Sequence, residues 1–522
     1  MGGGIFQLIA YGSQDVYLTG NPQITFFKAV YNRHSNFSIE SIEQVFTGAP
    51  DFNRKVSVTL GRNGDLIHRM FLEAEVSKKH GNPTFVNRPG FALFKSIEIE
   101  IGGQIIDKHY GEWMDIWCQL SHSKEQYDKL NHMINGSLHS NKTKQRGKFY
   151  IPLQFWFNRN VGLALPIIAL QYHDVKINIH LNKEANIRSS HHDNQSKFQL
   201  DSLKLYSDYI FLDTDERRRF AQVSHEYLIE QVQFNGNCVS SHLKDETTVK
   251  LNFNHPCKEL IWTVQSNLSI GKEMGGNGVY HYPFDFSRPN SSSSTLIELE
   301  QWEHNGIKYW VERDLLISGN HVIYDNNFNY MEIWGSNITQ GALGNEPSPN
   351  DPSIVKIFVD KFRDNISDNL IDFSLKFNGT DRFSTREGTY FRLVQSYQHH
   401  TGQFDQVRGI WNHQANGNYS KEKGFIYTYS FGINPEEHQP SGTCNFSRID
   451  NSIAILRLNK PNREVNYIES KMKEALLDND EDTFNSFKNL LPKNHENIIK
   501  IYATNYNILR ITSGMGGVAY SN

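Results

Sequence analysis

Histidine pairs are the groups of this chain best suited to bind a metal. His191-His192 precedes Asp193 in a Ser/Asn-rich stretch, and His399-His400 lies close to Gly402. Adjacent side chains on a strand point to opposite faces, so such a pair cannot easily share one ion. The 22 histidines include no His-x-His pair, the spacing that places two ligands on one strand face. We therefore predict no metal site and no cofactor.

Carboxylates at short spacing would suit the cleavage of glycosidic bonds, a reaction that β-sandwiches can host. Glu298, Glu300 and Glu303 fall along one candidate strand. The same residues would serve equally well as a charged edge that prevents strands from aggregating. No sequence feature identifies the other catalytic groups that such a site would need. The sequence also contains no G-x-S-x-G, P-loop or dinucleotide-binding fingerprint. The prediction is that the protein is not an enzyme and has no catalytic residues.

The charge balance argues against direct contact with nucleic acid. Lys and Arg number 53 against 57 Asp and Glu, a net charge of −4, whereas nucleic-acid binders usually carry a basic surface. The basic run at residues 217–219 follows Asp213 and Asp215 at i,i+4 spacing, which places acid and base on one helix face. This run is interpreted as a self-neutralised turn or a clamp between domains, not as a phosphate site.

The cysteines give no sign of a redox or metal framework. Cys118, Cys238, Cys257 and Cys444 are far apart in the sequence, without a Cys-x-x-Cys pair. A chain of 522 residues buries a large core without cross-links. We expect four reduced thiols and no bridge.

Eleven Asn-x-Ser/Thr sequons are candidate glycosylation sites. The first residues lack the basic region of a secretory signal, so unmodified side chains are the favoured expectation. If sugars are attached, the exposed candidates are Asn267, Asn290 and Asn337, which lie in a polar stretch. Asn445 is interpreted as structural.

Strand patterns dominate the first half of the chain. In residues 93–108, Ile97, Ile99 and Ile101 alternate with glutamates, and Gly102-Gly103 follows as a hairpin turn. A short helix is expected around residues 113–120, followed by a polar loop over residues 121–147. The other candidate strands are residues 55–60, 66–76, 175–181 and 198–212.

The second half repeats this plan with eight strand candidates, the number that a jelly roll uses. Two long insertions interrupt them. Residues 266–351 are polar and predict a loop excursion, whereas residues 461–493 carry apolar side chains three and four apart and predict a pair of helices. The candidate strands are residues 227–234, 247–253, 258–265, 353–359, 371–383, 425–433, 452–458 and 498–511.

The most specific string is PEEHQPSGTCNFSRID, residues 435–450, which we call the corner block. Pro440 and Gly442 preset or permit tight backbone angles, and Asn445 can hydrogen-bond its own main chain. These three residues predict a structural corner with no catalytic role.

The corner block, together with four other strings, resembles the major capsid proteins of the nucleocytoplasmic large double-stranded DNA viruses. The matching strings occur in the expected order from near the first residue to the last. They are DVYLTGNPQITFFKAVYNRHSNF (15–37), DYIFLDTDERRRFAQVSHEYLIEQVQF (208–234), FNHPCKELIWTVQ (253–265) and IYATNYNILRITSGMGGVAYSN (501–522).

This resemblance implies an all-β double jelly roll, with two eight-stranded antiparallel sandwiches side by side. The expected division is an N-terminal arm at residues 1–25, one jelly roll at 26–220 and the other at 221–522. The resemblance further implies homotrimeric capsomers that tile an icosahedral shell, made in the host cytoplasm. Its partners would be neighbouring capsomers, minor capsid and penton proteins and, through the arm, an inner membrane layer. A jelly-roll glycan-binding or fibre protein is the alternative.

Overall fold

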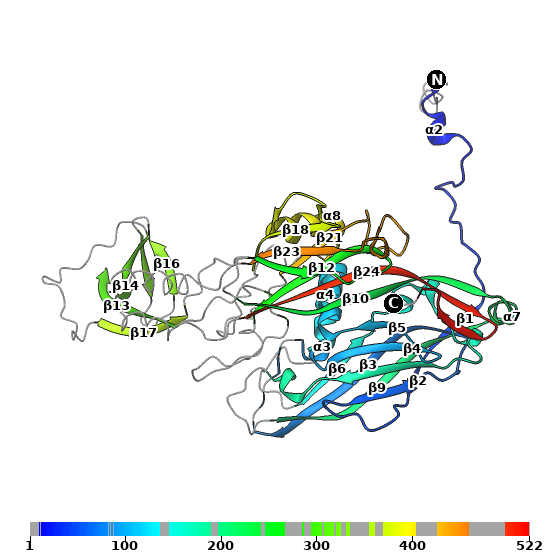
Figure 1. Ribbon diagram of the computed structural model, residues 1–522, viewed down its shortest axis with the longest axis horizontal. Coiled ribbons are helices and arrows are strands. Elements are labelled where there is room, and N and C mark those ends of the chain that lie inside the picture. Colours follow the sequence, from blue (N-terminus) through cyan, green and yellow to red (C-terminus); the bar gives the residue numbers. More distant parts are fainter. Residues whose placement is uncertain are drawn as a thin grey trace, which may run out of the picture.

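The computed structural model describes most of the chain (Figure 1). The described ranges are residues 12–81, 88–135, 146–188, 197–241, 246–266, 369–402, 425–458 and 496–520, together with the isolated residues 10, 83, 85, 86, 284 and 286 and the backbone of five strands between 294 and 360. The predicted helix pair at 461–493 lies outside the described residues.

The first jelly roll consists of two antiparallel sheets of four main strands. One has the order β1 (Phe37–Gln44), β9 (Lys197–Leu212), β3 (Leu66–His80) and β6 (Arg146–Pro152), and the short β7 (Leu165–Pro166) also pairs with β3. The other has the order β2 (Lys55–Thr59), β8 (Val175–Leu181), β4 (Phe94–Ile101) and β5 (Gln104–His109).

The alternation in β4 places its isoleucines in the core, as predicted. Ile97, Ile99 and Ile101 are fully buried, and Gly102 and Gly103 form the turn to β5 with φ angles of 57° and 87°. Both angles lie in the left-handed region that favours glycine. Glu98, one of the glutamates that alternate with these isoleucines, is also buried, and its carboxylate pairs with Lys108 at 2.9 Å.

The second jelly roll has the same two-sheet plan. One sheet runs β10 (His225–Ser241), β24 (Glu496–Thr512), β12 (Pro256–Ser266) and β21 (Ile426–Ser430), with β22 (Cys444–Asn445) on β12 and β25 (Met515–Val518) on β24. The opposing sheet runs β11 (Glu246–Lys250), β23 (Ser452–Leu458), β18 (Leu370–Phe377) and β19 (Thr380–Asp381), with β20 (Arg386–Glu387) on β18.

A third antiparallel sheet lies within the insertion that was predicted to be a loop. Its order is β16 (Tyr330–Trp334), β15 (Asn320–Tyr324), β14 (Ile307–Ile317), β13 (Ser294–His304) and β17 (Ile354–Asp360). The prediction of an unstructured excursion is therefore wrong. Residues 353–359 were expected in the second jelly roll, but β17 pairs with β13 in this sheet. The eighth main strand of the second jelly roll is β19, which pairs with β18 through a hairpin whose turn is Asn378-Gly379.

Helices fill the connections. They are α2 (Val16–Thr19), α3 (Pro89–Ala92), α4 (Gly111–Ser121), α5 (Lys124–Ile134), α6 (Trp156–Arg159), α7 (Thr214–Gln222), a π-helical turn (Tyr390–Val394) and α8 (Gln395–His399), with 3-10 turns at Val161–Leu163, Ile167–Ala169, Glu184–Ile187 and Phe446–Arg448.

Helix α5 corrects the predicted loop over residues 121–147. Ser123 and Gln126 form a reciprocal capping box at its start, which satisfies two of the donors left free at a helix N-terminus. Tyr127, Leu130 and Ile134 are buried along its inner face. Both signals were present in the sequence.

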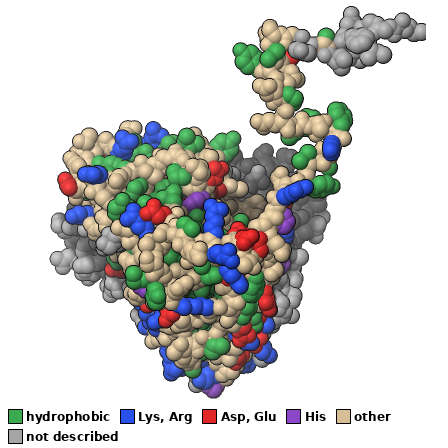
Figure 2. Space-filling view, turned by 90° about the vertical axis from the view of Figure 1, so that its right-hand side faces the viewer, with side chains coloured by type: hydrophobic (Ala, Val, Ile, Leu, Met, Phe, Trp, Pro, Cys, Tyr) green, Lys and Arg blue, Asp and Glu red, His purple; other side chains and the backbone are tan. Residues whose placement is uncertain are grey.

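An extended N-terminal segment precedes β1 and projects from the body of the protein (Figures 1 and 2). Between residue 12 and residue 36 every side chain is exposed. Phe26, Phe27 and Tyr31 are 90%, 99% and 87% exposed. Large apolar side chains in such a position normally belong to a contact surface.

Candidate functional site

The joint between the two jelly rolls is the first candidate site, and α4 forms its centre. This helix follows β5 of the first roll, yet its two faces enter different cores. Met114 and Cys118 belong to the first core, whereas Trp113, Ile116, Trp117 and Leu120 belong to the second. Every residue of this helix from Trp113 to Leu120 is buried, as expected of a helix enclosed between two layers. The short helix predicted around residues 113–120 is confirmed, and the cause of its aromatic content is this double burial.

Strands β10 and β24 also cross the joint. Near one end of β24, Leu509 and Ile511 pack in the first core, while Ile501 and Tyr502 further back pack in the second. The main-chain amide of Val232 on β10 donates to Asp107 Oδ1 at 3.0 Å, across to the first roll. The two sandwiches therefore share secondary structure and are not merely tethered by a linker.

A buried ion cluster lies at the same joint, around Glu230 of β10. Arg159 at the end of α6 reaches Glu230 at 2.5 Å, and Lys258 of β12 reaches it at 2.7 Å. His438 of the corner block lies 3.5 Å away. Burial alone would raise the pKa of Glu230, but Arg159, His438 and Lys258 outweigh it and lower the pKa to about 2. The carboxylate is therefore charged at all ordinary pH values and joins both rolls to the corner block.

The corner block itself is built on local hydrogen bonds. Gly442 has φ +137°, and a Cβ at this position would lie 3.0 Å from the carbonyl oxygen of Phe431. The Asn445 side chain accepts from the amide of Ser447 at 3.0 Å and so caps the 3-10 turn that follows. Pro440 precedes Ser441, whose Oγ accepts from the amide of Asn434 at 2.9 Å. The structural role of Pro440, Gly442 and Asn445 stays a prediction, which a Gly442→Ala substitution would test.

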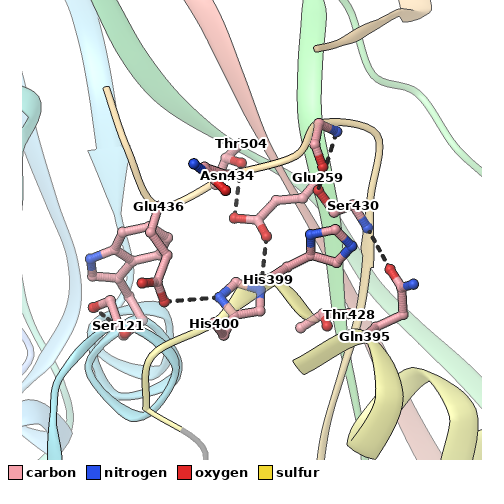
Figure 3. Close-up of polar contacts among 12 residues, drawn as sticks. Ser121, Glu259, Gln395, His399, His400, Thr428, Ser430, Asn434, Glu436 and Thr504 are labelled. Atoms are coloured by element: carbon pink, nitrogen blue, oxygen red, sulfur yellow. Dashed lines mark hydrogen bonds and ion pairs between the residues drawn. The ribbon is translucent and has the colours of Figure 1, made fainter. Parts of the chain in front are cut away.

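His400 connects the corner block to the second sheet (Figure 3). Its side chain is fully buried, with Nε2 3.1 Å from Glu259 of β12 and Nδ1 3.1 Å from Glu436 of the corner block. Burial alone would lower the pKa of His400, but the two carboxylates raise it to about 9. Its ring is therefore an imidazolium at neutral pH, and it holds two segments together electrostatically.

The neighbouring His399 has a different environment. Its Nδ1 lies 2.8 Å from the carbonyl oxygen of Ile433, and the contact is exposed. The two histidines thus have separate partners. Within the described ranges, no group of three or more His, Cys, Asp or Glu side chains is arranged to hold a metal ion.

Several other predicted candidates cannot be placed. His191 and His192 lie outside the described residues, as do Asn267, Asn290 and Asn337. Glu298, Glu300 and Glu303 do fall on a strand, β13, as the sequence predicted; only the backbone of that strand is described.

The basic run at 217–219 lies on α7, the exposed helix that connects the rolls. Asp213 caps this helix by accepting from the amide of Glu216 at 2.9 Å. Arg217 pairs with Asp65 of the first roll at 2.8 Å, not with Asp213 as the spacing suggested. The helix is confirmed and the expected pairing of Arg217 with Asp213 is wrong, because Asp213 serves as the cap.

A cavity of about 400 Å³ opens between the rolls. Lys95, Lys108 and Lys500 line it, and two of them have carboxylate partners: Lys108 pairs with Glu98 at 2.9 Å, and Lys500 pairs with Glu112. Tyr110 and Phe234 supply an apolar wall in edge-to-face contact. These contacts are those of a packed joint.

Sequence reasoning missed the functional residues of the joint. Arg159, Glu230 and Lys258 carry no local signal, because each is an ordinary charged residue until the fold brings them together. In the sequence, His400 is distinguished only as half of a histidine pair. The buried aromatic residues of α4 were the signal that could have located the joint.

Two family models match the chain in sequence. One, described as "Major capsid protein N-terminus", matches residues 25–213, and the other, "Large eukaryotic DNA virus major capsid protein", matches residues 216–517. Among curated relatives, the major capsid protein of Pyramimonas orientalis virus is 39% identical over 100% of both chains. That of Paramecium bursaria Chlorella virus 1 is 36% identical, again over 100% of both.

The chain belongs to the major capsid proteins of large eukaryotic DNA viruses. This confirms the resemblance found in the sequence.

Solved structures agree with the assignment. A quasi-atomic model of the PBCV-1 virus capsid has a TM-score of 0.60 and 31% identity, covering 95% of this chain and 100% of that one. The Faustovirus major capsid protein, at 11% identity, has a TM-score of 0.61 over 96% of this chain and 94% of its own, and shows the shared fold. The prediction of a double jelly roll is confirmed, and the glycan-binding or fibre alternative is not favoured. Among the described residues, no helix has the length and apolar character to cross a bilayer.

Proposed function

We propose that this major capsid protein acts as a homotrimer in which six jelly rolls form one pseudo-hexagonal capsomer. Three copies of a two-lobed subunit surround an axis with six similar wedges, and this outline tiles a flat facet. Contacts between neighbouring subunits are then heterologous and close after three rotations, which gives a discrete ring and not a filament.

The observation that carries this proposal is the joint described above. A trimer can imitate sixfold packing only if the angle between the two lobes of each subunit is fixed. Met114 and Trp117 anchor one helix in both cores, and Glu230 binds Arg159 and Lys258 where the rolls meet. Deforming this joint would require separating buried apolar and charged groups at once.

The test is the mass and outline of the purified protein. Mass photometry is expected to show particles of three times the mass of one chain, and negative-stain images are expected to show pseudo-hexagonal outlines. Obligate contacts of this kind commonly bury more than about 2,000 Å² in total, so the trimer should persist on dilution. A stable monomer at every concentration would contradict the proposal.

The exposed segment at residues 12–36, which begins within the predicted arm and extends past it, supports a second part of the proposal, contact with a minor capsid protein or an inner membrane layer. The side chains of Phe26 and Phe27 are 90% and 99% exposed. A variant with Phe26→Ser and Phe27→Ser is expected to form trimers normally but to lose capture of minor capsid proteins, or flotation with anionic vesicles. If the variant captures minor capsid proteins and floats with vesicles as the wild type does, this segment does not make the proposed contact.

We extend the proposal to the domain division, the other partners and the place of assembly. The division into an arm at 1–25 and jelly rolls at 26–220 and 221–522, the penton partners, the absence of catalysis and of direct nucleic-acid contact, and assembly in the host cytoplasm follow from the family and from the charge balance. Hydrolysis of a panel of glycans by the purified trimer would overturn the non-enzymatic part.

A further inference from the structure

Two cysteines that are far apart in the sequence lie directly opposite each other in the fold. Cys257 is the second residue of β12, and Cys444 is the first of β22 in the corner block. The antiparallel register pairs Pro256 with Asn445 and Cys257 with Cys444. Directly opposed residues of an antiparallel pair have side chains on the same face of the sheet.

This register satisfies the spacing that a disulfide needs. Opposed Cα atoms in antiparallel strands lie about 4.5–5.5 Å apart, and disulfides span Cα separations of about 4.4–6.8 Å. The short β22 is held at the rim of the sheet by few backbone bonds, which include the amide of Phe446 donating to the His255 carbonyl at 3.1 Å. A strand of two residues can adjust locally to reach the S–S distance.

The two thiols differ in their access to solvent. Cys257 is fully buried, and its Sγ donates to the carbonyl oxygens of Asn254 and His255 at 3.5 and 3.6 Å. Burial, with a smaller effect of the adjacent Cys444, raises the pKa of the Cys257 thiol. Cys444 is only partly buried, and burial raises its pKa despite the opposing charge of Arg382. Cys444 is therefore the thiol that a small oxidant reaches first, and Cys257 is the partner behind it.

We propose that Cys257 and Cys444 are a built disulfide site that closes when the capsid protein meets a peroxide. Cys444 sulfur attacks hydrogen peroxide, the O–O bond breaks, and a sulfenic acid and one water form. The Cys257 sulfur then attacks the Cys444 sulfur, the S–O bond breaks, and the hydroxyl leaves with the Cys257 proton as a second water. Two thiols lose two electrons in total and one peroxide gains them.

The bond would connect the corner block covalently to the central sheet of the second roll. That block already contributes Glu436 to His400 and His438 to Glu230. A disulfide between strands that are distant in the sequence closes a long loop and so restricts the unfolded chain strongly. The reduced protein can fold and assemble first, and oxidation then fixes the corner. This inference does not depend on the trimer.

The test uses the purified full-length protein in its native state. After exposure to hydrogen peroxide and blocking of free thiols with N-ethylmaleimide, proteolysis and mass spectrometry are expected to find one peptide pair joined through Cys257 and Cys444. Cys118 and Cys238 serve as internal controls and should stay unbridged. Dithiothreitol should separate the pair, and the thermal midpoint should be several degrees higher in the oxidised protein.

Two variants keep the test decisive. Cys444→Ser, at a partly exposed position, and Cys257→Val, which preserves an apolar core side chain, should each fold, lose the cross-linked peptide and lose the oxidation-dependent rise in thermal midpoint. The proposal is overturned if native wild-type protein keeps both thiols free under peroxide, if Cys444 proceeds to sulfinic acid without pairing, or if either cysteine pairs with Cys118 or Cys238 instead.

Discussion

Replacing Glu230 by Gln removes the charge at the centre of the joint while keeping its shape. Glu230 is 6% exposed and lies against Arg159 and Lys258. Lys258 would retain the carbonyl of Glu437 at 2.8 Å and the ring face of Tyr506, but no carboxylate. Breaking a buried pair by removing one partner typically costs about 3–5 kcal/mol. We expect a loss of this size near neutral pH.

The pKa of Glu230 gives an independent magnitude. It falls from 4.5 to about 2 in the folded protein, which at about 1.4 kcal/mol per pKa unit corresponds to about 3 kcal/mol of stability. A depressed carboxyl pKa contributes stability that is present above the unfolded value of 4.5 and is lost as pH falls through about 2. The difference between wild type and Glu230→Gln should therefore shrink in acid, by about 1 kcal/mol at about pH 3.5.

Urea unfolding followed by tryptophan fluorescence, at about pH 7, 5 and 3.5, measures this difference. Glu226→Gln is the matched control, because Glu226 lies on the same strand and pairs with Arg510 at 2.8 Å, but both side chains are exposed. An exposed pair contributes about 0–1 kcal/mol. If the two variants lose similar stability, or if the Glu230→Gln deficit is undiminished at the lowest pH, the account of the joint is wrong.

His400→Gln should destabilise the protein below about pH 6.5 and lose its effect as pH rises through about 9, because a raised histidine pKa contributes stability only while the ring is charged. Thermal midpoints across this pH range measure the effect, with His399→Gln, at a partly buried position, as the control. Gly442→Ala places a side chain at φ +137° and should cost about 1 kcal/mol or more in urea unfolding; a neutral result would remove Gly442 from the corner. Trp113→Ala should lower the free energy of unfolding by about 3–5 kcal/mol in urea unfolding and reduce the yield of trimers in mass photometry. Tyr397→Ala is the control: this side chain of α8 is 78% exposed, so neither quantity should change.

The parts of the fold that the sequence predicts are those with a strong local rule. The hairpin at Gly102-Gly103 was predictable because two adjacent glycines accept positive φ angles and the flanking residues alternate. Strands at the edge of a sheet are harder to predict from sequence. β1, Phe37–Gln44, is exposed along most of its length, so it never shows a buried stripe with a period of two. It is recognised only through its register with β9.

The candidate sites could not be predicted from local patterns, because their residues come together only in the folded chain. Glu230 is a polar residue within a predicted strand, and no neighbouring residue in the sequence indicates that Arg159 of the other roll will contact it. Cys257 and Cys444 have no spacing that suggests a pair; their register depends on where the corner block returns to β12. Local patterns predict elements, whereas these sites depend on contacts between distant segments.

The charged joint raises the question of why a purely apolar contact is not used there. Well-packed hydrophobic residues in place of a buried ion group are often as stabilising or more so. Apolar contacts, however, tolerate sliding, whereas Glu230 satisfies Arg159 and Lys258 in only one relative position of the rolls. In the trimer that we propose, the two lobes of each subunit stand in for two wedges of a hexagon, and such a subunit needs that single position more than it needs additional stability. The aromatic side chains of α4 hold the rolls together, and the ion cluster defines their angle.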